Sequence, residues 1–565
     1  MKSSPQNNRL ILAIIVTLAA ASYFINLGAS SLWDSNEAFY AGTPREMIES
    51  GDWINPSFNY RPRFNKPPLS YWIVASLYEV FGVSVSVERF AIAVAAVAMI
   101  AIAFGLGRLI SSIEAGLFAA IALAASPRFF MFSRRIMIDL YLAMFMSLAL
   151  LMFAMAERYP AKRRKYLVIM YIAIGLGIMT KGPVAALLPA AVFIIYSLFR
   201  GGAGLLRTMM IPQGVLVVAA IVLPWYLAIY QQHGWQYIES FILKDNLSRF
   251  TEPVWGPRRG PFFYLPVIIG DLLPYSPLLL AAAWAGLRRR TRGRTNSGLQ
   301  TEASSSISLL LLLWIAVIVA FYSLSSNKED LYILPAYAAA AAFIGKVLAD
   351  FINPATAKEQ ALAIRLGIIA VAAILFIAGA AIFYIFGPAS GPYRIAGATP
   401  ASIIAVACAV IVMLAAAFKS NFVAAATPAV ALVIFNWLLA LVILPDFERF
   451  KPVPRMCEVI ESRAETGDMV GYYRLASPSM SFYLGRQVFE YYQIEELQTA
   501  FSSGRSVYCL MTGDDYRAVK ERLGVETYIL ASHPVFQVKL KVILDRAELP
   551  QVVLISNKGD AGVGR

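Results

Sequence analysis

The sequence predicts an α-helical polytopic membrane protein with about thirteen transmembrane helices and a small C-terminal α/β domain. Hydrophobic residues make up 59% of the 565-residue chain and charged residues only 15%. The mean hydropathy is +0.62, and soluble domains usually contain about 25% charged residues. Because one crossing needs about 20 apolar residues, we expect spans near residues 9–25, 88–110, 113–132, 135–156, 164–180, 182–199, 208–230, 261–286, 306–323, 330–350, 362–386, 398–417 and 420–444.

The basic residues between these spans predict the orientation of the chain. A cytoplasmic N-terminus places four basic stretches inside, at residues 162–165, 200–207, 288–294 and Lys419. This arrangement satisfies the positive-inside rule. Topology and contact with anionic lipid headgroups then explain most of the +14 net charge, and we expect no nucleic-acid partner. Residues 1–445 form the transmembrane domain, whose loops 28–87 and 231–260 face outward together with a separate domain at 446–565.

The segment from residue 446 to residue 565 changes composition abruptly and predicts the outer α/β domain. Its short β-like runs include GDMVGYYR, SVYCLMTG and VETYILA, and they alternate with the helix-like runs EELQTAFSS and DDYRAVKERLG. The glycine turn lacks the G-x-G-x-x-G pattern of dinucleotide-binding proteins, so we expect no cofactor. Cys457 and Cys509 share this domain, where they either pair in an oxidising compartment or stay free.

Carboxylates in the first outer loop are candidates for chemistry at the membrane surface. Asp34 and Glu37 precede a helix-like segment. A carboxylate in this place can act as a general base for a sugar hydroxyl. It can equally cap the following helix and favour its first turn. The local pattern leaves both interpretations open.

Basic residues on the outer face are candidates for binding an anion. Lys66 stands before a double proline, where it either holds a phosphate as a point charge or extends toward the interface. Arg134 and Arg135 lie outside, against the topological rule that the other basic clusters obey. Anion binding beside Asp139 explains this exception, and the alternative is an ion pair between Arg135 and Asp139, four residues apart on one helix.

Further candidates occur at later outer helix ends and loops. Lys181 either binds substrate or caps the preceding helix carbonyls. Arg249 and Arg259 lie among aromatic residues in the outer loop 231–260. Lys328 and Tyr332 crowd into a tight outer turn. Aromatic and basic residues are also ordinary at membrane interfaces. The chain has only two histidines and no Cys/His metal spacing, so a metal site is not expected.

Seven collinear motifs between about residues 30 and 340 carry a family resemblance. They read NEAFYAGTPREMIESGDW, RFNKPPLSYW, RRIMID, TKGPVAALLP, PWYLAIY, DNLSRF and SSNKEDLYILP. Together they resemble the bacterial aminoarabinose transferase and protein O-mannosyltransferase superfamily, whose members are membrane glycosyltransferases of the GT-C fold. Each motif alone is weak, and the set is specific.

The resemblance implies an inverting glycosyltransferase at the periplasmic face of the bacterial inner membrane. Such an enzyme moves a sugar from a polyprenyl (undecaprenyl) phosphate to a lipid, glycan or protein acceptor, as in lipopolysaccharide modification. The family pattern implies that Lys66 binds the lipid phosphate and that Asp139 is the second essential carboxylate. It further implies that Arg249, Arg259 and Tyr332 hold the donor, with Lys181 in a supporting role.

The sequence departs from the family pattern at four positions. Asn36 stands where the family usually has aspartate, and an asparagine cannot act as a base. Among the neighbouring carboxylates we prefer Glu37 as the base, because it keeps the family's adjacent acidic position, and Asp34 is the alternative. Asn65 and Asn246 replace a glutamate and a histidine, and this replacement argues against a divalent metal. Phe39 replaces an arginine, which indicates a different donor sugar or pose.

A polyprenyl-linked glycan flippase is the main alternative function. Transporters usually carry ionisable residues or broken helices near mid-span, together with internal repeats. In this sequence the charges cluster at outer helix ends and in loops. A receptor whose C-terminal domain binds partners is a third possibility, but it leaves the outer charged residues unexplained.

Overall fold

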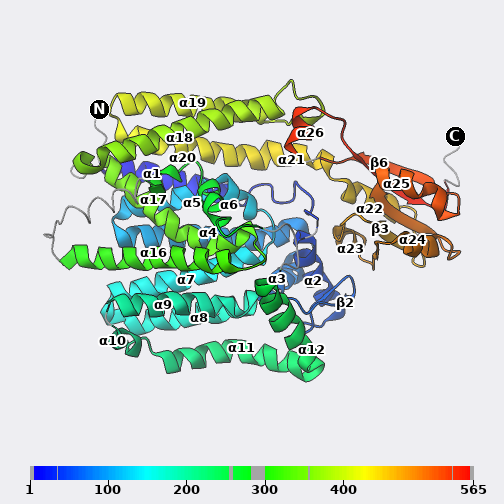
Figure 1. The fold of residues 1–565 in the computed structure, drawn as a ribbon, viewed down its shortest axis with the longest axis horizontal. Helices are drawn as coiled ribbons and strands as arrows, with labels where there is room; N and C mark the ends of the chain where they lie inside the picture. Colours follow the sequence, from blue (N-terminus) through cyan, green and yellow to red (C-terminus); the bar gives the residue numbers. More distant parts are fainter. Residues whose placement is uncertain are drawn as a thin grey trace.

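The computed structural model describes residues 5–559 apart from 35, 201, 253–258, 281–298, 354–356 and 537–538. Long helices run side by side in a bundle, and a small sheet domain lies at one end of it (Figure 1). This architecture confirms the predicted fold class, a polytopic helical protein with a C-terminal α/β domain.

Helices occur at the predicted spans, although part of the span 261–286 falls outside the described residues. Eight helical segments of the described chain are long and apolar enough to cross a membrane: Val85–Ile110, Ile138–Arg158, Ile211–His233, Ser304–Leu324, Asp330–Ile352, Leu362–Phe386, Ala398–Ala417 and Asn421–Phe450. Other bundle helices are α1 (Pro5–Ser22), α5 (Ile113–Ala124), α6 (Pro127–Phe132), α8 (Arg163–Lys181), α9 (Val184–Arg200) and α14 (Tyr264–Asp271).

Small residues let the central helices approach closely. The helices α4 (Val85–Ile110) and α17 (Tyr337–Ile352) both pack against α5. A Cβ atom added at Gly345 would lie 2.2 Å from the carbonyl oxygen of Ala115, and one at Gly107 would lie 2.7 Å from the same atom. Contacts of this kind between small residues bring helix backbones together where lipid provides no hydrophobic driving force. The described core is therefore rich in alanine and glycine.

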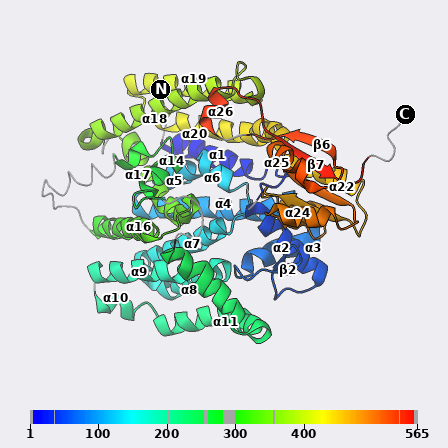
Figure 2. The same ribbon diagram turned by 45° about the vertical axis from the view of Figure 1, so that its right-hand side comes forward.

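The end of the bundle next to the sheet domain collects several short elements. The loop between α1 and α4 contains α2 (Asn36–Ser50), the antiparallel hairpin β1 (Ser57–Phe58) with β2 (Arg61–Pro62), and α3 (Leu69–Phe81). A later loop contributes α12 (Trp235–Ile238), a π-helix at Glu239–Ser248 and α13 (Arg249–Thr251). The 3₁₀ helix Asp330–Ala336 leads into α17. Figure 2 shows α2, α3 and β2 beside the C-terminal domain.

The C-terminal domain is built on a five-stranded mixed sheet in the order β4-β3-β5-β7-β6. The strands are β3 (Met469–Tyr473), β4 (Phe489–Tyr491), β5 (Val507–Thr512), β6 (Tyr528–Pro534) and β7 (Gln551–Ser556). Strand β3 is parallel to β4 and β5, and β7 is antiparallel to β5 and β6. The domain's helices include α22 (Pro452–Glu461), α23 (Ser479–Leu484), α24 (Ile494–Phe501) and α25 (Gly513–Val519).

The two faces of this sheet have separate hydrophobic cores, and this separation decides the state of the cysteines. Because side chains alternate along a strand, Cys509 on β5 packs in the core that contains α24 residues, whereas Tyr508 packs in the core that contains α22 residues. Cys457 on α22 belongs to the second core. Both cysteines, like Cys408, are buried free thiols. Of the two alternatives that the sequence left open, the structure therefore has the free thiols, because Cys457 and Cys509 lie in different cores.

Candidate active site

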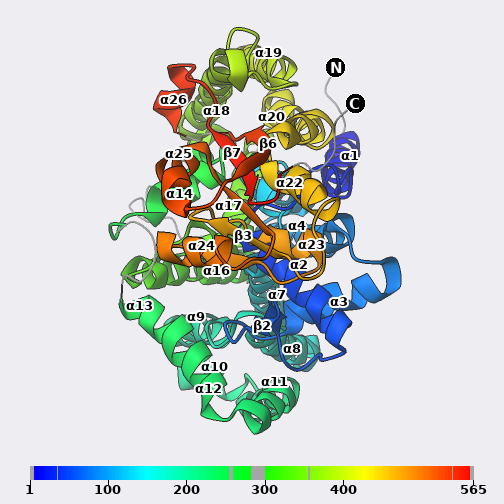
Figure 3. The ribbon, with the colours of Figure 1, turned by 90° about the vertical axis from the view of Figure 1, so that its right-hand side faces the viewer.

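Figure 3 shows end-on the end of the bundle that faces the C-terminal domain. Charged side chains gather there in two neighbouring clusters. We call the first the Lys66 cluster, and it consists of Arg63, Lys66, Asp139, Lys181, Asp245 and Tyr332. We call the second the Glu37 cluster, and it consists of Asp34, Glu37, Arg89, Arg135, Lys451 and Ser479.

Lys66 is buried and lies at a rigid point of the chain. Its residue exposure is 8%, and the double proline that follows fixes the backbone direction. The ammonium group donates a hydrogen bond to the carboxylate of Asp245 and another, at 2.9 Å, to the carbonyl oxygen of Asn65. Asp245 comes from the π-helix Glu239–Ser248. Local sequence patterns did not indicate this partner, because the two residues are 179 positions apart.

Lys181 and Asp139 form a second ion pair in the same cluster. Asp139 lies in the first turn of α7 (Ile138–Arg158), where the helix dipole favours a negative charge, and Lys181 is the last residue of α8. Each side chain is 15% exposed. The Lys181 ammonium lies 4.5 Å from the centroid of the Tyr332 ring. Asp139 therefore pairs with Lys181 rather than with Arg135, the partner that the helical spacing suggested.

Arg259 and Lys328 lie together in the adjoining outer turn. The guanidinium of Arg259 donates to the carbonyl oxygen of Lys328 and lies 3.5 Å from a carboxylate oxygen of Glu329. The buried Lys328 ammonium donates to the carbonyl oxygen of Ser325 at 2.5 Å. The side chain of Arg249 lies outside the described part of the structure. The turn thus brings two of the predicted binding residues beside Tyr332, which is only a few residues further along the chain.

Glu37 is enclosed by a buried ion pair with Arg89. The Nε and Nη2 atoms of Arg89 lie 2.9 and 3.1 Å from the two carboxylate oxygens, and the side chains are only 2% and 1% exposed. The backbone N–H of Trp33 donates to the same carboxylate at 2.7 Å. Arg89 also donates to the carbonyl oxygens of Leu27, Ser30 and Ser31. Both oxygens of Glu37 are engaged in holding the loop, which is a poor setting for a general base.

Asp34 faces the C-terminal domain instead. One of its carboxylate oxygens accepts hydrogen bonds from the backbone N–H of Ser479, at 3.0 Å, and from the hydroxyl of the same serine on α23. Burial raises the pKa of Asp34 to about 6, although the Ser479 hydrogen bonds act in the opposite direction. A carboxylate with this pKa is ionised at neutral pH and is basic enough to accept a proton.

Lys451 holds the same loop from the side of the C-terminal domain. Its ammonium donates to the hydroxyl of Ser30 at 2.7 Å and to the carbonyl oxygen of Ser31 at 2.6 Å, and it lies 4.0 Å from the Trp33 ring centroid. Burial lowers the pKa of Lys451 to about 7, and the charge of Glu448 opposes this shift. The sequence contains no motif near Lys451 or Ser479 that indicates a contact with residues 30–34.

Arg134 and Arg135 differ in their surroundings. Arg134 is buried and donates to the carbonyl oxygens of Ile25 and Asn26 at 2.9 and 2.8 Å, so it holds the chain that leaves α1. The guanidinium carbon of Arg135 lies 4.0 Å from the Trp33 ring centroid. Its buried Nε has no hydrogen-bond partner. Of these two arginines, Arg135 is therefore the one with an unpartnered buried N–H that an anion could use.

The residues at the family's metal position do not fit a divalent metal. Among the described residues, no group of three His, Cys, Asp or Glu side chains can hold a metal ion. The amide of Asn246 donates to the carbonyl oxygen of Phe241 at 2.7 Å, and Asn65 offers a second neutral amide. Neutral amides are weak ligands for zinc.

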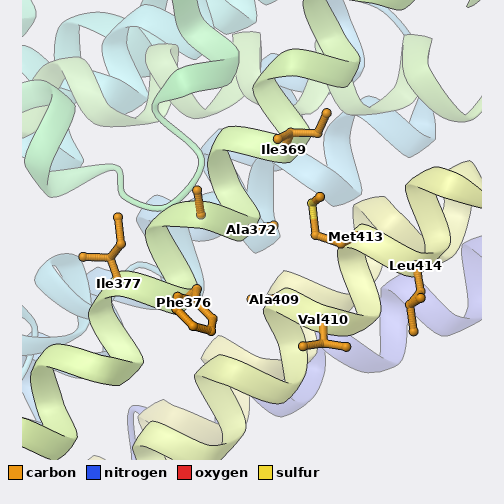
Figure 4. A pocket seen from close by; sticks show the side chains of 9 residues that line it. Ile369, Ala372, Phe376, Ile377, Ala409, Val410, Met413 and Leu414 are labelled. Atoms are coloured by element: carbon orange, nitrogen blue, oxygen red, sulfur yellow. The ribbon is translucent and has the colours of Figure 1, made fainter.

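An apolar groove lies away from both clusters. It runs between α18 (Ala357–Phe386) and α19 (Ala398–Ala417), with a volume of about 390 Å³. Figure 4 shows that only apolar side chains line it, among them Phe376 and Met413. It offers no polar group for catalysis, and we assign the chemistry to the charged clusters.

Comparison with known proteins agrees with this architecture. Residues 65–227 match the family model of dolichyl-phosphate-mannose-protein mannosyltransferases. An uncharacterized protein from Aquifex aeolicus is 32% identical over 60% of this chain and 63% of its own length. An undecaprenyl phosphate-alpha-4-amino-4-deoxy-L-arabinose arabinosyl transferase from Pseudomonas savastanoi is 30% identical, and the match covers 66% of this chain and 67% of that protein.

A solved structure extends the likeness to the whole chain. ArnT from Cupriavidus metallidurans, bound to undecaprenyl phosphate, superposes with a TM-score of 0.76 at 22% identity, covering 98% of this chain and 99% of that chain. The fold is that of the GT-C membrane glycosyltransferases. The chain belongs to the superfamily of aminoarabinose transferases and protein O-mannosyltransferases. Its sequence match spans somewhat less than two thirds of the first two curated relatives, at 63% and 62% of their lengths.

Replacement of Glu37 by glutamine is expected to destabilise the protein. The change leaves the buried Arg89 without its counter-charge. The loss of one partner of a buried ion pair lowers the free energy of unfolding by about 3–5 kcal/mol. Thermal unfolding of the detergent-purified protein measures this loss. The double variant Glu37→Gln/Arg89→Met is expected to recover part of it, and Glu49→Gln, at a more exposed pair with Arg45, serves as the control. A Glu37→Gln protein that is fully stable but inactive would restore Glu37 as the base.

Activity is expected to survive extensive chelation, because the amides of Asn65 and Asn246 cannot replace the carboxylate and imidazole ligands of a divalent metal. Turnover is measured after treatment with EDTA, and elemental analysis measures the zinc content of the purified protein. Loss of turnover that added zinc or another divalent ion restores would contradict this expectation.

Proposed function

We propose that the protein is an inverting glycosyltransferase that moves a sugar from a polyprenyl phosphate, such as undecaprenyl phosphate, to a lipid, glycan or protein acceptor. The observation that carries this proposal is the Lys66 cluster. It gathers buried cations at the end of a GT-C bundle, in a fold whose Cupriavidus member was crystallised with undecaprenyl phosphate. A lipid-linked donor brings its phosphate to the membrane surface, where these cations lie.

The proposed orientation follows from the charges between the helices. With a cytoplasmic N-terminus, both charged clusters and residues 446–565 lie on the periplasmic face of the inner membrane. The sugar is then already activated on its lipid carrier when it reaches the site. This is consistent with a sequence that has no nucleotide-binding fingerprint.

Lys66 and Lys181 are proposed to stabilise the departing lipid phosphate. In the absence of substrate each ammonium is neutralised by a carboxylate, Asp245 for Lys66 and Asp139 for Lys181. A donor phosphate that enters the cluster competes for these ammonium groups and gains a negative charge as the glycosidic bond breaks. Preorganised cations that meet developing charge lower the barrier of such a step. We assign Arg249, Arg259, Lys328 and Tyr332 to the outer part of the donor site.

Asp34 is the carboxylate that we propose as the base. It removes the proton of an acceptor hydroxyl while the acceptor oxygen forms its bond to the anomeric carbon. The bond from that carbon to the lipid phosphate oxygen breaks on the opposite side, so the configuration inverts. The enclosed position of Glu37 and the pairing of Asp139 with Lys181 support this assignment over the Glu37 that the sequence favoured.

The function is tested with the purified full-length protein and undecaprenyl-phosphate-linked sugars. Mass spectrometry identifies co-purifying lipid-linked sugars and follows their consumption with candidate acceptors. We expect the wild type to release undecaprenyl phosphate and to form a product of inverted anomeric configuration. Absence of turnover with every lipid-linked donor, together with transport of such a lipid across vesicles, would favour a flippase instead.

Lys66→Ala provides the inactive control for this experiment. The substitution removes the buried ammonium from the proposed phosphate site and is expected to abolish transfer while the protein remains folded. Lys244→Ala is the matched control, because Lys244 is adjacent to Asp245 in sequence but its side chain is 70% exposed. Normal turnover by the Lys66→Ala protein would remove Lys66 from the site.

Asp34→Asn is expected to lower the turnover rate by about 100-fold or more, the scale for removing a general base. Because protonated Asp34 cannot accept a proton, wild-type turnover should fall as the pH falls through the Asp34 pKa of about 6. The Ser479 hydrogen bonds favour the ionised form, so Ser479→Ala should raise this pKa and move the acid limb to higher pH. A pH–rate profile measures both effects. If the acid limb of the pH–rate profile does not move in the Ser479→Ala variant, the limb does not report the protonation of Asp34.

A further inference from the structure

Arg63 is a cation of the Lys66 cluster that the family pattern does not identify. It follows the β1–β2 hairpin and precedes Lys66 by three residues. Its side chain is partly buried, and its guanidinium carbon lies 4.1 Å from the centroid of the Phe39 ring. The Tyr40 hydroxyl lies within electrostatic range of Arg63, Asp139 and Asp245. Arg63 therefore shares its surroundings with both lysine–aspartate pairs.

The charges of this region leave Arg63 without a counter-ion. Lys66 pairs with Asp245, Lys181 with Asp139, and Arg259 with Glu329. Among the described residues, no carboxylate forms an ion pair with Arg63, and its buried Nε has no hydrogen-bond partner. A partly desolvated guanidinium with an unused donor gains most from an anion that arrives from outside the protein.

Phe39 explains how the guanidinium is held in place. The ring stands where related transferases commonly carry an arginine on the same helix. In this chain Arg63 reaches from the hairpin onto the face of the ring, an arrangement that cation–π attraction stabilises. The positive charge is thus supplied from a different element of the fold, with the buried Nε–H still without a hydrogen-bond partner.

We propose that Arg63 is a substrate-binding residue whose guanidinium binds phosphate oxygens of the lipid-linked donor beside Lys66. This inference rests on the proposed function. The planar fork of an arginine matches two phosphate oxygens, whereas the ammonium of Lys66 acts as a point charge. The guanidinium keeps its positive charge at every working pH, so it remains able to stabilise the phosphate as the sugar leaves.

The inference is tested by equilibrium binding of undecaprenyl phosphate to the detergent-purified protein. Arg63→Ala is expected to raise the dissociation constant about ten- to a hundredfold, the range for a hydrogen bond to a charged group, and Arg63→Lys should recover only part of the loss. Arg61→Ala is the matched control, because Arg61 lies two residues earlier on the same hairpin and is exposed. In turnover assays the KM for the donor should rise and the KM for the acceptor should stay unchanged.

The outcomes separate this inference from the function on which it rests. If Arg63→Ala binds undecaprenyl phosphate with the dissociation constant of the wild type, the role of Arg63 is overturned and the glycosyltransferase proposal remains intact. A wild type that binds no undecaprenyl phosphate overturns the proposed function itself. Inorganic phosphate is the comparison ligand. If it binds as tightly as undecaprenyl phosphate does, the proposal that Arg63 binds the lipid-linked donor is overturned. Unfolding temperatures of the Arg63→Lys and Arg63→Ala proteins establish that any loss arises in the folded state.

Discussion

The buried ion pair between Glu37 and Arg89 is the interaction on which the outer end of the molecule depends. It joins the first turn of α2 to α4, and Arg89 uses its remaining N–H groups to hold the carbonyl oxygens of Leu27, Ser30 and Ser31. Two charges in a nearly dry site require such complete hydrogen bonding to offset the loss of water. The loop that carries Asp34 is fixed between α1 and α2 as a result.

A similar constraint shapes the Lys66 cluster. Buried ammonium groups need a counter-charge, and Asp245 and Asp139 provide it before any substrate is bound. Under the proposed function the site is therefore assembled in advance, and an incoming phosphate would exchange with carboxylates rather than with bulk water. Such an exchange costs little reorganisation, because the cations already occupy their positions.

Sequence patterns predicted the helices and several members of the site, but not their partners. The lengths of the apolar runs placed the bundle helices, and the short motifs contain Lys66, Asp139, Lys181 and Tyr332, which the structure brings together in the Lys66 cluster. The same motifs did not indicate that an ion pair encloses Glu37, because its partner Arg89 lies 52 positions away. The Asp34–Ser479 contact spans 445 positions. Pairs so distant leave no local periodicity or spacing from which one chain can reveal them.

The contact between Asp34 and α23 also bears on how this protein can diverge. The C-terminal domain meets the membrane domain through polar contacts, among them Ser479 with Asp34, Lys451 with Ser30 and Ser31, and Val488 with Asn59, and through ring contacts of Phe536 with Phe386 and Tyr393. Most of the sheet can therefore accumulate substitutions without reaching the proposed base. Exchange of the whole domain between relatives therefore has to preserve α23, the segment around Lys451 and the contacts of Val488 and Phe536, because these short stretches join the two modules.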